Sequence, residues 1–323
     1  MAASDTLQRP RTERVRLSSI PGSGRGRIAR TGGARRSGRI WILTDSRYLG
    51  QRMPSALIDR LRADWQEPRV IVADEGPVLS HVAPLVDPVV LSAWSGLRAG
   101  DLVVARSRHP LALALLDEAD ARGARTLNAP QAVHRVRDKA TCALALARRG
   151  LPIPRTLIVR HPSDLAALSA SAFPIVVKPV YGDNARGVRV VASPEELGES
   201  EPGGELLLAQ AYVDTEGFDV KLYVAGDHVW ATRRPSPLLS PDAPPTRVPV
   251  TPGLRAIAEG CRAEFGLRLF GVDVLESESG LQIVDVNDFP NYTGVDEAPE
   301  AIGAMLAAAT VADAAGKSWC VAC

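Results

Sequence analysis

Several residue types are scarce in this chain, and each scarcity narrows what the protein can be. Of its 323 residues 38 are basic, and only four of those are lysine: Lys139, Lys178, Lys221 and Lys317. Because arginine serves wherever a surface charge is enough, the remaining lysines are candidates for positions that need a compact ammonium group. The formal net charge of only +1 argues against a nucleic-acid partner attracted by a global field.

Long apolar runs are absent as well. No run reaches the roughly 18 residues that a membrane-spanning helix needs, and no signal peptide is recognisable. We therefore expect a cytoplasmic, reducing setting without a membrane partner. Cys142 and Cys261 lie in expected helices and are typical of small core residues. Cys320 and Cys323 form a lone Cys-x-x-Cys, which is at most half of a zinc site.

The first third of the chain divides into a basic arm and an α/β region. Residues 1–38 are rich in Arg, Ser and Gly and poor in apolar residues, which predicts a disordered basic N-terminal arm. Strands then alternate with helices, which predicts a parallel sheet. We expect strands at 39–45, 69–74, 101–106 and 125–128, and helices at 53–65 and 111–122. No Gly-x-Gly-x-x-Gly follows the first strand, so dinucleotide binding there is unsupported.

The rest of the chain mixes helices with antiparallel strands. We expect helices at 129–149, 164–171, 254–265 and 298–315, and strands at 155–159, 173–178, 187–191 and 205–213. The segments 218–224 and 228–233 flank Ala-Gly-Asp and predict a hairpin. The proline-rich stretch 235–249 is expected to be irregular.

One stretch, LQIVDVNDFPNYTGV, concentrates oxygen ligands. Asp285 and Asn287 lie two apart, so on a strand both side chains point to the same face. Asp273 lies in another apolar strand, where an acid is costly unless it is paired or binds a metal. Two neighbouring antiparallel strands would bring these three residues together, and their oxygens are ligands of the kind that Mg²⁺ takes. The alternative is that Asp285 and Asn287 merely end a strand.

A second motif surrounds Lys178, which ends the apolar strand PIVVK. Gly182 and Gly187 follow it and permit a tight turn whose N–H groups can face an anion. The turn is not a Walker A loop, because the Gly-Lys-Ser/Thr ending is absent. A strand lysine, a glycine turn and a later Asp…Asp-x-Asn set are a more specific combination than any one of them.

The order of these parts resembles the ATP-grasp superfamily, and specifically its RimK-like carboxylate–amine ligases. The matching segments are LNAPQAVHRVRDKATCALALARRGLPIP, FPIVVKPVYGDNARGV, QAYVDTEGFDVKLYVAGDHVWATRR and LFGVDVLESESGLQIVDVNDFPNYTGV. The resemblance implies an α/β (α+β grasp) fold, with an N-terminal parallel α/β pre-grasp domain followed by a two-lobed ATP-grasp fold. The implied boundaries are 39–128 for the first domain, 129–315 for the second (small lobe about 155–213, large lobe about 214–315) and 316–323 for a tail.

The resemblance also implies how ATP is held. Lys139 and Lys178 would contact the phosphates, beneath a flexible loop from Gly182 to Gly187. The hinge around adenine would be formed by Gln210, Ala211, Tyr212 and Val213, and Asp219 and Lys221 would lie near the ribose and phosphates. Ala211 departs from the pattern, since RimK-like ligases have a glutamate there. Asp219 and Lys221 have a simpler interpretation as a cross-strand surface pair.

For the metal and substrates the resemblance implies a further set of roles. Asp273, Asp285 and Asn287 would hold two Mg²⁺ ions, for which Mn²⁺ can substitute, because phosphoryl transfer needs positioning and charge neutralisation. Arg233, with Arg234, would bind an anionic substrate or intermediate as a bidentate fork, unless the pair is a solvated strand end. The implied substrates are a small molecule or peptide with a carboxylate, and an amine acceptor.

Three functions follow, of which we favour the ATP-dependent ligase working through an acyl phosphate. The basic glycine-rich segment of RimK-like ligases is replaced here by PSPLLSPDAPP, which leaves the acceptor open. RRPSPL and VDVNDFPNYTGV also resemble inositol polyphosphate kinases, so a small-molecule kinase is the second hypothesis. A nucleotide-binding protein without turnover is the third. The oligomeric state is left open, with a homo-oligomer as one option.

Overall fold

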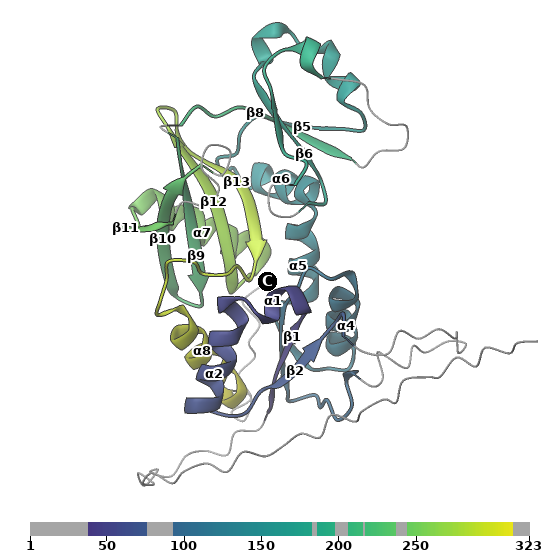
Figure 1. Cartoon of the computed structure of the whole chain (residues 1–323), viewed down its shortest axis with the longest axis vertical. Coiled ribbons are helices and arrows are strands. Elements are labelled where there is room, and N and C mark those ends of the chain that lie inside the picture. The colour runs from purple at the N-terminus through teal and green to yellow at the C-terminus, as the bar shows by residue number, and fades with distance from the viewer. Residues whose placement is uncertain are drawn as a thin grey trace, which may run out of the picture. The chain divides into compact units, whose positions relative to one another are not determined.

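The computed structural model describes residues 38–75, 93–182, 186–197, 206–215, 217–236 and 244–312. Except for Gly38, the predicted basic arm lies outside these residues, as do Cys320 and Cys323. Within the described part, three sheets carry the architecture (Figure 1).

The first sheet is parallel, as the alternation of strands and helices predicts. It contains β1 (Ile40–Thr44), β2 (Arg69–Val72), β3 (Leu102–Arg106) and β4 (Arg125–Leu127) in the order β2-β1-β3-β4. The short helix α1 (Ser46–Leu49) follows β1. All residues of β1 and β3 are buried. Strands buried on both faces appear in sequence as continuous apolar runs, which is why they were recognisable.

Helices cover both faces of this sheet. On one face α2 (Arg52–Asp64) lies beside the C-terminal helix α8 (Ala298–Ala312), and their buried side chains share a core with Ile40 and Ile42 (Figure 1). On the other face α4 (Pro110–Ala121) packs against Trp41 and Leu43. The last helix of the described residues therefore completes the core of the first sheet.

The second sheet is antiparallel and five-stranded. Its order is β11 (Thr246–Val248), β10 (His228–Pro235), β9 (Phe218–Ala225), β12 (Leu269–Ser277) and β13 (Gly280–Asp288). Leu222 and Val224 point toward the helix α7 (Pro252–Phe265), while the alternate residues Lys221 and Tyr223 point to the opposite face. The predicted β9–β10 hairpin is confirmed. The prediction of an irregular chain at 235–249 is wrong for Thr246–Val248, which form β11.

The third sheet is antiparallel and four-stranded. Its order is β5 (Thr156–Val159), β8 (Leu207–Ala211), β6 (Ile175–Pro179) and β7 (Arg189–Val191). The α-helix expected at 164–171 is wrong: two 3₁₀ turns, η1 (Pro162–Ala167) and η2 (Ala170–Ala172), occupy the segment, and a third, η3 (Pro194–Glu196), follows β7. The backbone becomes extended at Leu168, with ψ 145°, so an α-helix cannot continue there.

The helix expected at 129–149 is also corrected. It is two helices, α5 (Pro130–Arg137) and α6 (Lys139–Arg148), separated at Asp138, whose ψ is 99°. The Asp138 carboxylate accepts a hydrogen bond from Thr141 N at 2.8 Å and so caps α6. The sequence contains the capping pattern Asp-x-x-Thr at 138–141. The apolar face that continues through this pattern nevertheless favoured a single helix. The break places Lys139 at the first position of α6.

Two predicted core cysteines lie where expected, under the large sheet. Cys142 and Cys261 are both buried. Burial raises the pKa of both thiols, that of Cys261 to about 12, so neither ionises near neutral pH.

Among the described residues, no helix is both long and apolar enough to cross a membrane.

Asn128 links the end of β4 to the start of β12. Its Oδ1 accepts hydrogen bonds from Arg268 N at 2.8 Å and Leu269 N at 3.0 Å. Its Nδ2 donates to Leu269 O at 2.6 Å, and the side chain is buried. One amide thus satisfies two backbone N–H groups and shares the Leu269 carbonyl with Phe289 N, which donates to it at 3.0 Å.

Replacing this amide is expected to destabilise the protein. Asn128→Ala leaves the backbone N–H groups of Arg268 and Leu269 without this acceptor, so we expect the free energy of unfolding to fall by about 2–4 kcal/mol. Denaturant unfolding measures this difference. The control is Thr126→Ala, which removes an exposed hydrogen bond to Asp120 and should have little effect. Equal effects of the two variants would contradict the role given to Asn128.

Candidate active site

Two carboxylates and an amide meet where β12 and β13 pair. Asp273 lies directly opposite Asp285 in the strand register. Asn287 Nδ2 donates to Asp273 Oδ2 and to Asp285 Oδ2, both at 3.2 Å. The structure therefore brings together the three residues that sequence analysis proposed as metal ligands, on the face of the sheet opposite α7.

A bulge in β13 leaves a backbone carbonyl to which a lysine donates a hydrogen bond. The register shifts after Asp273, so that Val274 pairs with Ile283 and Val284 has no partner on β12. The Val284 carbonyl accepts a hydrogen bond from Lys178 Nζ at 2.8 Å. Lys178 reaches it from β6 of the small sheet, and its side chain is buried. The apolar strand before Lys178 therefore serves to carry its ammonium group into the site.

The other two described lysines lie beside the carboxylates. Lys221 Nζ is 2.8 Å from Asp273 Oδ1, so Lys221 pairs with Asp273 rather than with Asp219. Lys139 Nζ is 3.5 Å from Asp285 Oδ1 and donates to Gly182 O at 3.2 Å. Three ammonium groups thus surround two carboxylates, which leaves the cluster positive and suited to a polyanion such as a phosphate chain.

Burial and neighbouring charges compete in this cluster. Burial lowers the pKa of the Lys178 ammonium. Burial also opposes the charged forms of Lys221 and Asp285, but in each case the neighbouring charges outweigh it. Asp273 raises the pKa of Lys221, and Lys139 with Lys178 lowers the pKa of Asp285. Asp285 is therefore an anion at neutral pH, as a metal ligand must be.

The donor set fits a hard divalent cation. Asn287 Nδ2 lies equally close to one oxygen of each carboxylate, so both carboxylates face one point. Carboxylate and amide oxygens are the donors that Mg²⁺ accepts. Within the described ranges no three His, Cys, Asp or Glu side chains come together as a possible metal site, so a cation here would need Asn287 as its third donor.

The glycine turn lies next to Lys139 and Lys178. Gly182 supplies the carbonyl that Lys139 contacts. Gly187 has a φ of 73°, and a Cβ there would lie 2.9 Å from Pro179 Cγ, so glycine is required. Residues 183–185 of the predicted loop lie outside the described residues.

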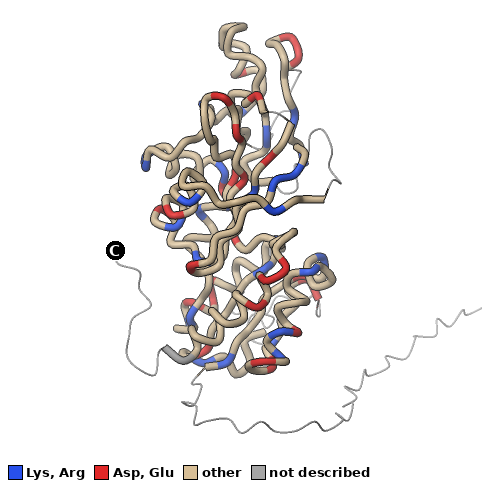
Figure 2. The backbone as a smooth tube through the Cα atoms, turned by 90° about the vertical axis from the view of Figure 1, so that its left-hand side faces the viewer, with Lys and Arg blue, Asp and Glu red and all other residues tan. Residues whose placement is uncertain are grey.

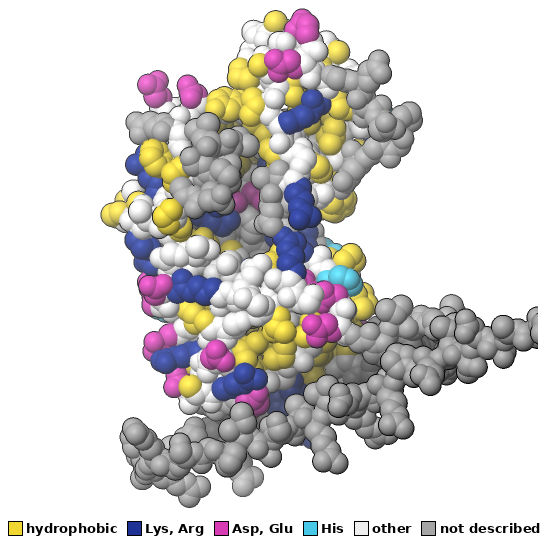
Figure 3. All heavy atoms as spheres, viewed as in Figure 1, with side chains coloured by type: hydrophobic (Ala, Val, Ile, Leu, Met, Phe, Trp, Pro, Cys, Tyr) yellow, Lys and Arg dark blue, Asp and Glu magenta, His cyan; other side chains and the backbone are white. Residues whose placement is uncertain are grey.

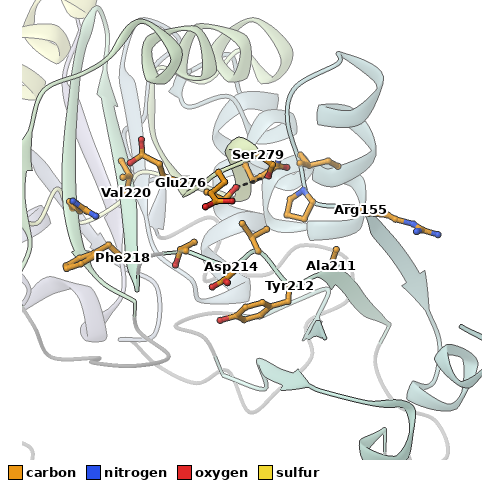
Figure 4. Close-up of a pocket in the computed structure, with 16 residues that line it drawn as sticks. Arg155, Ala211, Tyr212, Asp214, Phe218, Val220, Glu276 and Ser279 are labelled. Atoms are coloured by element: carbon orange, nitrogen blue, oxygen red, sulfur yellow. Dashed lines mark hydrogen bonds between the residues drawn. The ribbon is translucent and has the colours of Figure 1, made fainter. Parts of the chain in front are cut away.

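The predicted hinge lines a groove of about 1020 Å³. Figure 4 shows Tyr212 and Asp214 across from Glu276 and Ser279 of the β12–β13 hairpin. Ala211 and Val213 also line the groove. Gln210 instead is buried, donates to Thr156 Oγ1 at 3.0 Å, and borders a water-sized cavity beside Lys139, Val284 and Asp285. One end of the predicted hinge, Gln210, therefore lies beside the charged cluster, and the residues after it line the open groove.

The two arginines predicted to bind substrate point to opposite faces of the sheet. Arg233 pairs in register with Val220 and lines the groove, with its guanidinium 4.2 Å from the Phe218 ring centre. Arg234 pairs with Asp219, on the face of the carboxylate cluster. Burial raises the pKa of Asp219, and its Oδ1 has no hydrogen-bond partner among the described residues. The following segment, 237–243, lies outside the described residues.

Two arginines that were not predicted from the sequence, Arg108 and Arg137, also reach the end of β13. Arg108 follows β3, and its Nη2 donates to Asn287 Oδ1 at 2.9 Å. Its Nη1 lies 3.2 Å from Asp288 Oδ1, and Arg137 Nη2 lies 2.8 Å from Asp288 Oδ2. In the sequence, the feature that could have indicated Arg108 is its place at the carboxyl end of a parallel strand, where α/β proteins bind ligands. That feature does not identify the distant partner.

Outside this cluster the charges are mixed. Blue and red segments are interspersed along the backbone in Figure 2. On the face in Figure 3, basic and acidic side chains lie next to one another over α2, where Arg60 pairs with Asp64 and Arg62 with Glu67. The described surface therefore agrees with the small net charge.

Comparison with known proteins gives the family. Residues 136–309, more than half of the chain, match the model of the RimK-like ATP-grasp domain. The chain therefore belongs to the RimK-like ATP-grasp family. This membership confirms the family and fold class predicted from the sequence, and it favours a ligase over the inositol polyphosphate kinases.

One named relative is the probable alpha-L-glutamate ligase 1 of Shewanella amazonensis. It is 27% identical over 284 residues, which cover 74% of this chain and 94% of the relative. Another, the probable alpha-L-glutamate ligase of Legionella pneumophila (strain Corby), is 28% identical over 57% of this chain and 66% of its own length.

Solved structures show the same fold. The ATP-grasp ligase PsnB, complexed with precursor peptide PsnA2 and AMPPNP, aligns with a TM-score of 0.63 and 18% identity, over 87% of this chain and 100% of PsnB. D-cycloserine synthetase DcsG aligns with a TM-score of 0.65 and 20% identity, over 84% of this chain and 100% of DcsG.

Asp288 gives a prediction about stability and pH. Burial opposes its charge, but Arg108 and Arg137 outweigh burial and lower the pKa of Asp288. The stability that it contributes is complete above the unfolded pKa of about 3.9 and is lost as the pH falls through the lower folded value. We expect Asp288→Asn to cost about 3 kcal/mol at pH 7 and progressively less below about pH 4.

Denaturant unfolding from pH 7 to pH 3 measures this dependence. The control is Asp59→Asn, because Asp59 is exposed and lies 3.7 Å from Arg62. That variant should follow the wild type at every pH. A constant difference between wild type and Asp288→Asn across the range would refute the account.

Proposed function

We propose that this chain is an ATP-dependent carboxylate–amine ligase whose active site is the cluster of three lysines and two carboxylates. The observation that carries the proposal is Asn287 within 3.2 Å of both Asp273 and Asp285, with Lys139, Lys178 and Lys221 around them. A fold does not need two partly buried carboxylates to face each other. A phosphate chain with a divalent cation does use such a set.

The proposed reaction has two steps. A carboxylate oxygen of the acid substrate attacks the γ-phosphorus of ATP, the bond to the bridging oxygen breaks, and ADP leaves from an acyl phosphate. The nitrogen of the amine then attacks the acyl carbon, phosphate leaves, and the amine loses a proton. Most of the catalysis is positioning and stabilisation of negative charge.

Each part of the site has a proposed role toward ATP. Lys139 and Lys178 bind the phosphates, beneath the turn from Gly182 to Gly187. The hinge, Gln210 to Val213, borders the adenine, and its backbone groups make the contact, so that Ala211 in place of glutamate is tolerated. Asp219 accepts a hydrogen bond from a hydroxyl of the ribose; its buried Oδ1, which has no partner among the described residues, supports this role.

Asp273, Asp285 and Asn287 would hold two Mg²⁺ ions, with Mn²⁺ as a substitute. Such ions neutralise the charge that develops on the phosphoryl oxygens. A second PsnB structure, with a TM-score of 0.62 and 18% identity over 84% of this chain and 98% of PsnB, is of a complex with minimal precursor, Mg and ADP. Lys221 holds the Asp273 carboxylate by its ion pair.

The proposed substrates are an amino acid or peptide carboxylate and an amine. The relatives named as glutamate ligases and the peptide complex of PsnB support this class. Arg234, on the face of the cluster, is the better placed of the two arginines for an anionic substrate. Residues 39–128 would form the pre-grasp domain and 129–315 the ATP-grasp domain.

Trapping the acyl phosphate tests the reaction. We expect the purified chain, with Mg-ATP, hydroxylamine and a panel of amino acids and short peptides, to release ADP and form a hydroxamate. Hydroxylamine replaces the amine and captures the activated carboxyl group. ADP release with a stable phosphate ester and no hydroxamate would instead identify a kinase.

Lys178 tests the site. We expect Lys178→Met to lower kcat for ADP release at least about hundredfold, because it removes a buried cation from the phosphates. Asp285→Ala should abolish turnover. The matched control is Lys317→Met, since Lys317 lies beyond the segment that matches the family. Full activity in Lys178→Met, measured with thermal melting to verify folding, would remove the site assignment.

A further inference from the structure

The amide of Asn287 has only one favourable orientation in this structure. Its Nδ2 donates to both Asp273 and Asp285, and its Oδ1 accepts from Arg108 Nη2 at 2.9 Å. Turned by 180°, the amide oxygen would face two carboxylate oxygens and the NH₂ group would face a guanidinium. Both contacts would be repulsive, so the neighbouring charges determine the orientation.

This orientation excludes Asn287 from binding a cation. An amide ligates a hard cation through its oxygen, but here the NH₂ group points to the carboxylates and the oxygen points to Arg108. A cation between Asp273 and Asp285 makes the opposite orientation favourable. The turned NH₂ group would then face the Arg108 donors, so the bond from Arg108 to Asn287 and ligation by Asn287 are mutually exclusive.

We propose that Arg108 is a positioning residue that holds Asn287 turned away from the cation site until a divalent cation binds and breaks the Arg108–Asn287 bond. The proposal rests on the proposed function for the cation. Two further interactions hold Arg108 in place. Its backbone N donates to Asp45 Oδ2 at 3.0 Å, and Nη1 lies 3.2 Å from Asp288 Oδ1.

The arrangement gives the first sheet a means to sense the cation. When Asn287 turns, Arg108 loses one partner and keeps Asp288, which also binds Arg137. The loop after β3 therefore has two states of hydrogen bonding, one for each state of the cation site. Because the bond stabilises only the cation-free state, Arg108 reduces the affinity for the cation.

Removing Arg108 should therefore tighten cation binding. Mn²⁺ is titrated into the full chain with saturating AMPPNP, and free Mn²⁺ is measured by electron paramagnetic resonance. We expect Arg108→Gln to bind Mn²⁺ about tenfold more tightly than the wild type, the effect of one charge-assisted hydrogen bond. A merely structural loss would weaken binding instead, and the tightening that comes from the lost charge alone is measured with the control variant below.

Arg137→Gln is the matched control, because it removes a charge from the same Asp288 without contacting Asn287. We expect it to tighten Mn²⁺ binding by less than about threefold, through charge alone. In an Asn287→Ala background the difference between the two arginine variants should shrink to the effect of charge alone. Equal effects in the wild-type background, or weaker binding by Arg108→Gln, would overturn the proposal.

The outcomes separate this proposal from the proposed function. If the wild type forms hydroxamate while Arg108→Gln and Arg137→Gln bind Mn²⁺ equally, the ligase stands and the role of Arg108 is wrong. If no hydroxamate forms but Arg108→Gln binds more tightly as expected, Arg108 controls the cation site of another ATP-using enzyme. If the wild type binds no Mn²⁺ beyond that of AMPPNP, the proposal falls with the cation site.

Discussion

The pairing of β12 with β13 sets the central constraint on this structure, because it brings two largely buried carboxylates face to face. Asp273 and Asp285 would repel each other unless cations compensate them. Lys221 and Lys139 approach from β9 and α6, and Lys178 crosses from the small sheet to the β13 bulge. Elements from three parts of the chain therefore converge on one point, which is where a nucleotide and a cation are bound in our proposal.

The same constraint explains why the first sheet carries so much charge at the carboxyl ends of its strands. Arg108 contacts Asn287 and Asp288, and Arg106 Nη1 donates to Phe289 O at 2.9 Å. Phe289 and Tyr292 have positive φ values of 39° and 50°, which non-glycine residues adopt at a cost of roughly 1–3 kcal/mol each. Both are buried. The turn after β13 is thus held by the first sheet.

The sequence predicted most of the strands correctly and allowed the ligand candidates to be proposed, because both depend on local patterns. Apolar runs in β1 and β3, and the Asp-x-Asn spacing in β13, are readable without a partner. The break before Lys139 was missed although Asp138 and Thr141 have the spacing of a cap, because the apolar face continues through it. The 3₁₀ turns at 162–172 were missed for a related reason: a short polar and alanine-rich segment fits several kinds of turn.

By itself, the sequence determined the family, the order of the elements and the residue types that can bind phosphate and metal, since these are carried by motifs of a few residues. The tertiary structure alone decided which charges meet. The Val284 carbonyl at the bulge accepts a hydrogen bond from Lys178, and Arg108 reaches Asn287 across 179 positions of the chain. Contacts between residues so far apart follow from how sheets pack against each other, and no local spacing records them.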